Sequence, residues 1–119
     1  MQAVVRKSAG KGFTELLSVD AAGICYDATA KGTRCIGWSD ITWVGAFKRS
    51  NEAGEFNCIW IRSPKEEFPV EFDAREPMWD TLAHAMPRHL RGFRPLEKWF
   101  PPSLHPTLEI NMQNVYERA

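Results

Sequence analysis

The histidines of this 119-residue chain are the first residues to test for metal binding or acid–base chemistry. His84 and His89 lie five positions apart in a segment with helical periodicity, which directs their side chains about 140° apart on a helix of ~3.6 residues per turn. One ion cannot easily collect both rings, and His105 lies far along the chain. An HExxH motif, a CxxC pair and the acidic loop of a cation site are all missing. We therefore expect no metal site and no cofactor.

The cysteines Cys25, Cys35 and Cys58 each fall inside a segment that has the character of a strand. None has the basic neighbour that would favour a reactive thiolate. An odd number without CxxC spacing favours buried thiols in a reducing compartment over a metal or redox role. If the strands around Cys25 and Cys35 form a hairpin with an even register, these two cysteines lie opposite or diagonal to each other.

Motifs of hydrolases and of phosphate-binding enzymes are missing as well. The chain has no GxSxG sequence for a nucleophilic serine. The Gly-Lys-Gly segment at 10–12 lacks the spaced first glycine and the Lys-Ser/Thr ending of a phosphate-binding loop. The sequence therefore predicts a protein that is not an enzyme.

Short β-type runs separated by turn signals fill the first two thirds of the chain. In the last run, Phe68, Val70 and Phe72 alternate with Pro69 and acidic residues, which is typical of a half-buried strand. Pro69 favours an edge position for it, because proline cannot donate to a sheet ladder. The predicted strands span residues 4–6, 13–19, 24–27, 33–38, 41–49, 55–62 and 67–73.

The hydrophobic period then changes to that of a helix. Glu76 and Pro77 mark a helix start, because acidic residues and proline are favoured in the first turn. Pro87 lies inside the pattern and should kink or end the helix near Met86, since it removes a backbone donor. The apolar stripe of this helix consists of Trp79, Leu82, Ala83, Met86 and Leu90.

Seven short strands followed by one amphipathic helix resemble the element order of the pleckstrin-homology-like (PH-like) superfold. The segment 36–44, Ile-Gly-Trp-Ser-Asp-Ile-Thr-Trp-Val, is similar to the I-x-W-x-D-I-x-x-V junction of small bacterial PH-like domains. The segment 19–26, Val-Asp-Ala-Ala-Gly-Ile-Cys-Tyr, fits their V-x-x-x-G-I-x-Y hairpin. The resemblance covers residues 13–90 and supports fold better than function. It implies a mainly β domain, a sandwich or partly open barrel of about seven antiparallel strands, with a C-terminal helix that plugs one open end.

The best-known activity of PH-like domains is phosphoinositide binding, which depends on a lysine followed by an Arg-x-Arg or Lys-x-Arg element. The corresponding loop offers Lys7 and Lys11, but the segment 13–15 follows without a basic pair. We therefore expect no phosphoinositide or membrane binding. The same lysines, together with Lys31, are the candidate residues for a small ligand at the open end of the sandwich.

Composition limits the partners and the compartment. Lys+Arg 15 balance Asp+Glu 15, and a net charge of +0 argues against a dedicated nucleic-acid binder. The first residues show no apolar run of signal-peptide length, and no window approaches the ~20 apolar residues of a membrane span. The sequence thus predicts a cytoplasmic protein with one domain over residues 1–119, in which a core of about 1–92 precedes an ordered extension, 93–119, that the pattern does not place.

Charged and aromatic residues are unevenly distributed along the chain. Residues 66–80 hold six acidic residues against one arginine, and residues 88–98 hold four basic residues against one glutamate. Such segregation either complements the helix dipole or steers a partner. Trp43 and Trp60 lie on strands that are apolar on both faces, and these must be covered on both. The cover is the chain's own segment 93–116, a second copy of the chain, or another protein.

The sequence therefore predicts a non-enzymatic PH-like module that binds a protein or a second copy of itself. An immunity or adaptor protein of a bacterial secreted-toxin system is one version of this prediction. The alternative is a small-ligand or lipid-headgroup binder that uses Lys7, Lys11 and Lys31. The candidate partner surface consists of Trp43, Trp60, Arg88, Arg91 and Arg94.

Overall fold

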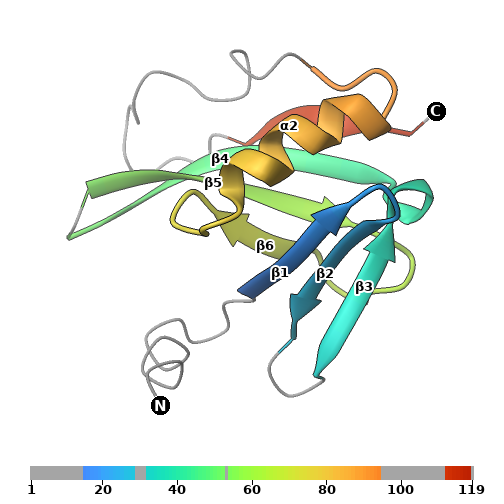
Figure 1. The fold of residues 1–119 in the computed structure, drawn as a ribbon. Coiled ribbons are helices and arrows are strands. Elements are labelled where there is room, and N and C mark those ends of the chain that lie inside the picture. Colours follow the sequence, from blue (N-terminus) through green and yellow to red (C-terminus); the bar gives the residue numbers. More distant parts are fainter. Residues whose placement is uncertain (1–14, 29–31, 53, 95–111, 119) are drawn as a thin grey trace.

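In a computed structural model, the chain forms two antiparallel β-sheets and a helix that packs over them (Figure 1). The structure describes residues 15–28, 32–52, 54–94 and 112–118. The first sheet, in the order β1-β2-β3, comprises β1 (Glu15–Asp20), β2 (Gly23–Asp27) and β3 (Thr33–Gly37). The second sheet, in the order β6-β5-β4-β7, comprises β4 (Trp43–Asn51), β5 (Gly54–Arg62), β6 (Val70–Asp73) and β7 (Gln113–Glu117). The helix is α2 (Trp79–His89), and a 3-10 turn, η2 (Trp38–Asp40), joins the two sheets.

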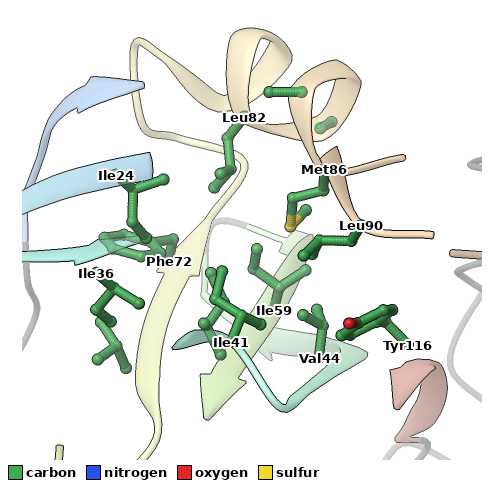
Figure 2. Packing of buried hydrophobic residues seen from close by; sticks show 14 of the residues in the cluster. Ile24, Ile36, Ile41, Val44, Ile59, Phe72, Leu82, Met86, Leu90 and Tyr116 are labelled. Carbon is green, nitrogen blue, oxygen red and sulfur yellow. The ribbon is translucent and has the colours of Figure 1, made fainter. Parts of the chain in front are cut away.

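The hydrophobic core lies between the inner faces of the two sheets and helix α2 (Figure 2). Side chains alternate along each strand, so Val44 and its partner Ile61 both point inward. Leu82 and Met86 of α2 lie four residues apart, on one face of the helix, and point into the same core. The side chains with no exposed surface include Ile24, Ile36, Ile41, Val44, Ile59, Ile61, Leu82 and Met86.

The segment 36–44 fills the core as its apolar pattern predicts. Ile36, Trp38 and Ile41 are all buried. The indole Nε1 of Trp38 donates to the backbone oxygen of Asp20 at 2.9 Å, and its ring stacks on His89 of α2 at 4.8 Å. Trp38 therefore connects the first sheet to the end of the helix.

The predicted strands between residues 13 and 62 are confirmed with small shifts at their ends, whereas the predicted strand 4–6 lies outside the described residues. The last predicted strand is too long: β6 begins at Val70, and Phe68 exposes 72% of its surface instead of lying in the core. β5 ends at Arg62, which leaves Phe68 without a partner residue in the ladder.

The helix does not end near Met86 as its proline predicts. α2 continues through Pro87 to His89, and the Leu90 N–H still donates to the Met86 carbonyl at 2.8 Å. Leu90, the last residue of the predicted apolar stripe, is buried directly after the helix. Packing of this last turn against the core outweighs the loss of one backbone donor at Pro87.

The helix is also not the last element, because β7 follows it and pairs with β4. Tyr116 lies opposite Val44, and the Tyr116 ring stacks on Phe93 at 5.7 Å. The sequence left this segment unplaced, since β7 pairs with a strand some 70 positions earlier, which no local pattern indicates. The described strands form two separate sheets and do not close into a barrel. The described residues are mainly β, with one α-helix among them.

We expect Gly23→Ala to lower the free energy of unfolding by about 2–5 kcal/mol. Gly23 has a φ of +150°, and a Cβ there would lie 2.1 Å from the backbone oxygen of Ile36 on the neighbouring strand. Gly32 is a matched control, because its φ is +76° but no atom lies within 4 Å of its Cβ position. Gly32→Ala should therefore cost only about 1–2 kcal/mol. Urea unfolding followed by tryptophan fluorescence measures the stability of both variants. An equal loss of stability in the two would contradict the close approach of Gly23 to the Ile36 backbone oxygen.

Candidate functional site

The structure separates the tryptophans of the predicted partner surface from its arginines. Trp60 pairs with Gly45, two residues from Trp43, so both indoles lie on the face of the second sheet that points away from the core. α2 packs on the opposite face of this sheet, and Arg88, inside the helix, and Arg91, just after it, are exposed there. Arg94 lies beside β7, where its N–H donates to the Val115 carbonyl at 2.9 Å. A single flat partner cannot contact both groups.

The predicted ligand-binding residues Lys7, Lys11 and Lys31 all lie outside the described residues. The small-ligand site that they would form therefore stays a prediction.

The outer face of the second sheet carries a layer of aromatic rings covered by arginines, here called the arginine–aromatic layer. Gly45 leaves room for the Trp43 ring, since a Cβ at Gly45 would lie 2.3 Å from it. Arg62 then lies over that ring with its guanidinium carbon 5.1 Å from the ring centroid. Such cation–π contacts are favourable at partly exposed sites. The layer consists of Trp43, Phe47, Arg49, Phe56, Trp60, Arg62, Glu71, Asp73 and Arg75.

Two further arginines cover rings in the same layer. Arg49 lies 5.1 Å from the Phe47 centroid, and Arg75 lies 4.2 Å from the Phe56 centroid. Phe47 also meets Trp60 edge to face at 5.4 Å. The arginines thus cover these rings in part, and Met112, which belongs to the segment 93–116 proposed as a cover, reaches the same face, with its sulfur 2.6 Å from the Cβ position of Gly45. The sequence contained a signal for the arginine cover: Phe47 and Arg49 are two residues apart on one strand, so their side chains lie on the same face.

Carboxylates hold these arginines in place. Glu71 on β6 accepts two hydrogen bonds from Arg49 on β4, at 2.8 and 2.7 Å, and one from the indole Nε1 of Trp60 on β5 at 2.8 Å. One carboxylate therefore joins three neighbouring strands, and its hydrogen bonds raise the pKa of Arg49. Asp73 binds Arg75 in the same bidentate way, at 3.0 and 2.9 Å. Glu71 and Asp73 belong to the acidic segment 66–80, so this segment is not a free negative surface.

A hollow of about 350 Å³ lies next to the arginine–aromatic layer, between the start of β4 and the β5–β6 loop, residues 63–69. Arg62 belongs to both, because it lines the hollow and lies over Trp43. Phe68 also lines the hollow and is the most exposed large apolar side chain among the described residues. The layer and the hollow therefore form one continuous surface.

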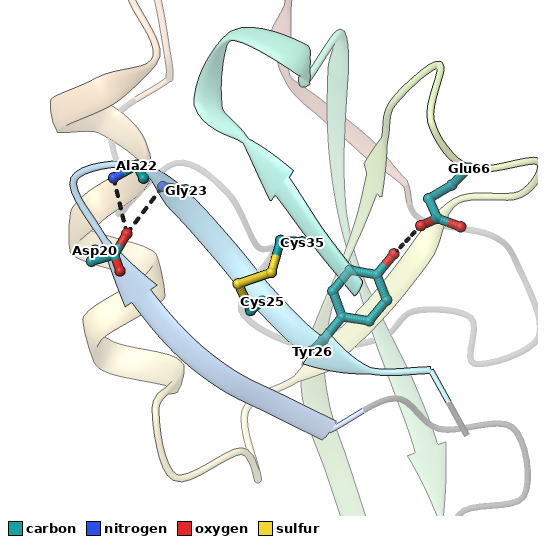
Figure 3. Close-up of a disulfide and its surroundings, with 7 residues drawn as sticks. All are labelled: Asp20, Ala22, Gly23, Cys25, Tyr26, Cys35 and Glu66. Carbon is teal, nitrogen blue, oxygen red and sulfur yellow. Dashed lines mark hydrogen bonds between the residues drawn. A yellow bond between two sulfur atoms is a disulfide. The ribbon is translucent and has the colours of Figure 1, made fainter. Parts of the chain in front are cut away.

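The β5–β6 loop is tied to the first sheet by a second cluster, here called the Glu66 clamp. Tyr26 and Arg34 lie opposite each other on β2 and β3. The Tyr26 hydroxyl and the Arg34 Nε both donate to Oε2 of Glu66, each at 2.5 Å (Figure 3 shows Tyr26 and Glu66). Burial, and then the hydrogen bond with Glu66, raise the pKa of Tyr26, while Glu66 raises the pKa of Arg34. Tyr26 therefore stays protonated and Arg34 charged, as the clamp requires.

A disulfide joins Cys25 to Cys35, one pair along the ladder from the Glu66 clamp (Figure 3). The prediction that these two cysteines are buried, reduced thiols is wrong: Cys35 is exposed and Cys25 is half-buried. The even register that the hairpin allowed is present and places them directly opposite. Disulfides persist in oxidising compartments. The prediction of a cytoplasmic location relied in part on reduced cysteines, and the disulfide removes that argument.

Cys58 is the free cysteine among the described residues, and it is buried as predicted. Its environment is unsuited to nucleophilic chemistry. Burial, followed by the nearby charges of Glu71 and Asp73, raises the pKa of the Cys58 thiol to about 12. The thiol is therefore neutral and inert at physiological pH.

His84 and His89 lie along a groove of about 540 Å³ between α2 and the β1–β2 turn, and His105 lies outside the described residues. The Nδ1 atom of His84 lies 2.8 Å from the backbone oxygen of Asp80, and His89 is stacked on Trp38. Among residues 15–28, 32–52, 54–94 and 112–118, no group of three or more His, Cys, Asp or Glu side chains is arranged to hold a metal ion. The His84 ring is thus held by a contact within the helix, and the His89 ring by the indole of Trp38.

No family model, no curated protein and no solved structure matches this chain. The PH-like resemblance therefore remains a prediction from the residues that carry it. None of the helices in the described part of the chain has the length and apolar character needed to cross a bilayer.

We expect the protein to lose stability as the pH rises above about 9, in part because of Cys58. The thiol has an ordinary pKa of 9.0 in the unfolded chain and about 12 in the folded protein. Between these values the unfolded state has released the proton and the folded state has not, so rising pH favours unfolding. Urea unfolding at pH 7, 9 and 10 measures how steeply the free energy of unfolding falls with pH. Cys58→Ala should make this fall smaller, and an equally steep fall in the variant would exclude the buried thiol as a cause.

Proposed function

We propose that this protein is a non-enzymatic, PH-like protein-binding module. Its docking surface is the arginine–aromatic layer together with the adjoining hollow. The observation that supports this most directly is the residue content of one continuous face, on which arginines lie over half-buried tryptophans: tryptophan and arginine are the types most enriched among residues that dominate binding energy. Burial of Ile36, Trp38 and Ile41 agrees with the PH-like junction pattern and supports the fold assignment.

The partner is a protein segment that carries a carboxylate next to an apolar side chain. Glu71 and Asp73 already neutralise Arg49 and Arg75. Arg62 is exposed, and no described carboxylate pairs with it. A guanidinium held over an indole keeps N–H groups that a carboxylate can accept in a bidentate way. Phe68 and the hollow beside Arg62 then receive the apolar side chain.

A random peptide display library panned against the full chain tests this proposal without a known partner. We expect the selected peptides to combine Asp or Glu with a neighbouring apolar residue. Fluorescence polarisation should show at least about tenfold weaker binding to Arg62→Glu and to Phe68→Ala, as is usual for residues that dominate an interface.

Leu17→Ala is the matched control, because Leu17 is also an exposed large apolar residue, at 45%, but lies on β1 of the other sheet. Its peptide affinity should equal that of the unaltered protein. Peptides without carboxylates, or affinities that Arg62→Glu and Phe68→Ala leave unchanged, would overturn the proposal. A dimer in sedimentation equilibrium that Arg62→Glu dissociates would also overturn it, since the occupant would then be a second copy.

A further inference from the structure

We propose that the Cys25–Cys35 disulfide is a site of reversible thiol–disulfide exchange with a dithiol reductant, and that its redox state controls how firmly the Glu66 clamp holds the β5–β6 loop. The consequence for binding rests on the proposed function, because this loop presents Phe68 to the docking surface. The exchange and the control of the loop are independent of it.

Access to the disulfide favours attack at Cys35. Ile24 and Tyr26 on β2 point into the core, as Ile36 does on β3, so the cysteines between them point outward. Cys35 is exposed, and β3 is an edge strand with β2 as its described neighbour. A thiolate in solution therefore reaches the Cys35 sulfur without any opening of the core.

The exchange takes place in two steps. The reductant thiolate attacks Sγ of Cys35, the bond between Cys35 and Cys25 breaks, and Cys25 leaves as a thiolate that takes a proton from water. The second thiol of the reductant, as its thiolate, then attacks the reductant sulfur of this mixed disulfide and releases the Cys35 thiolate, which is protonated in turn. The protein disulfide gains two electrons and the reductant becomes a disulfide. Cys58 takes no part, because it is buried on the second sheet.

The disulfide is placed to control the clamp. Tyr26 directly follows Cys25, Arg34 directly precedes Cys35, and both pairs lie opposite each other in one ladder. The disulfide therefore fixes β3 to β2 next to the two donors that must meet at Glu66. After reduction this edge strand loses its covalent tie to β2 and is held by non-covalent contacts, which include those of Arg34, and edge strands open locally at low cost. Each opening of β3 withdraws Arg34 from Glu66 and from the Lys65 carbonyl, to which its Nη2 also donates at 3.3 Å.

The first experiment treats the native protein with dithiothreitol at pH 8 and follows the thiols by iodoacetamide alkylation and mass spectrometry. We expect Cys25 and Cys35 to become alkylated while Cys58 stays unmodified, because Cys58 reacts only when the whole domain unfolds. Alkylation of all three cysteines at one common rate would overturn exchange in the native state, since reduction would then require global unfolding. Failure of dithiothreitol to reduce the disulfide in the folded protein would overturn it equally.

The second experiment measures amide hydrogen exchange of the oxidised and reduced protein in the absence of any partner. The Glu66 N–H, bonded to the Ser63 carbonyl, and the Lys65 N–H, bonded to Ser63 Oγ, report on the loop. We expect both amides to exchange about tenfold faster after reduction. Equal rates in the two redox states would overturn control of the loop and would leave the proposed docking function untouched.

Two variants complete this test. Arg34→Gln keeps the disulfide but removes an ionic donor to Glu66, so the loop should exchange fast in both redox states. Cys25→Ser/Cys35→Ser should reproduce the reduced protein under oxidising conditions, with Cys58 still protected. If the double variant instead exposes Cys58 to iodoacetamide, the disulfide is needed for folding, which overturns a reversible role.

Discussion

The pairing of β4 with β5 is the constraint on which the rest of the structure depends. Both strands have nine residues and pair along their whole length, from Trp43 opposite Arg62 to Asn51 opposite Gly54. Because side chains alternate along a strand, this one ladder divides its residues between two environments. The inner row forms the core with α2 and the first sheet, and the outer row forms the arginine–aromatic layer. A register shift by one residue would move charged side chains into the core.

Long-range ion pairs then arrange the surface that this ladder creates. Glu71 on β6 forms an ion pair with Arg49 on β4, on the far side of β5. Glu66, in the β5–β6 loop, forms an ion pair with Arg34 on β3 of the first sheet. These contacts explain how a chain with a net charge of +0 and a strongly acidic segment leaves few free carboxylates there. The arginines are held over aromatic rings, so a surface that is apolar in sequence becomes one with exposed guanidinium groups.

Much of the fold follows from local patterns, and the errors have identifiable physical causes. Strand alternation correctly placed Val70 and Phe72 on the buried face of one strand, because a two-residue period needs no knowledge of the partner strand. The pattern failed at Phe68, because a strand ends where its partner ends, and that partner is β5. It failed at Pro87, because burial of Leu90 outweighs a local helix-breaking preference. β7 was missed, since its five residues pair with a strand some 70 positions earlier.

Patterns of neighbouring residues were enough to show that the chain is mainly β, where most strands begin and end, and that Cys25 and Cys35 can face each other. These are properties of near neighbours along the chain, and short-range sterics and hydrophobic period decide them. Only the tertiary structure decided that the two cysteines form a disulfide, that Trp43 and Trp60 lie on the opposite side of the sheet from Arg88, and that Glu66 joins two strands of the other sheet. Each of these depends on the register and packing of segments far apart in sequence, which no local pattern encodes.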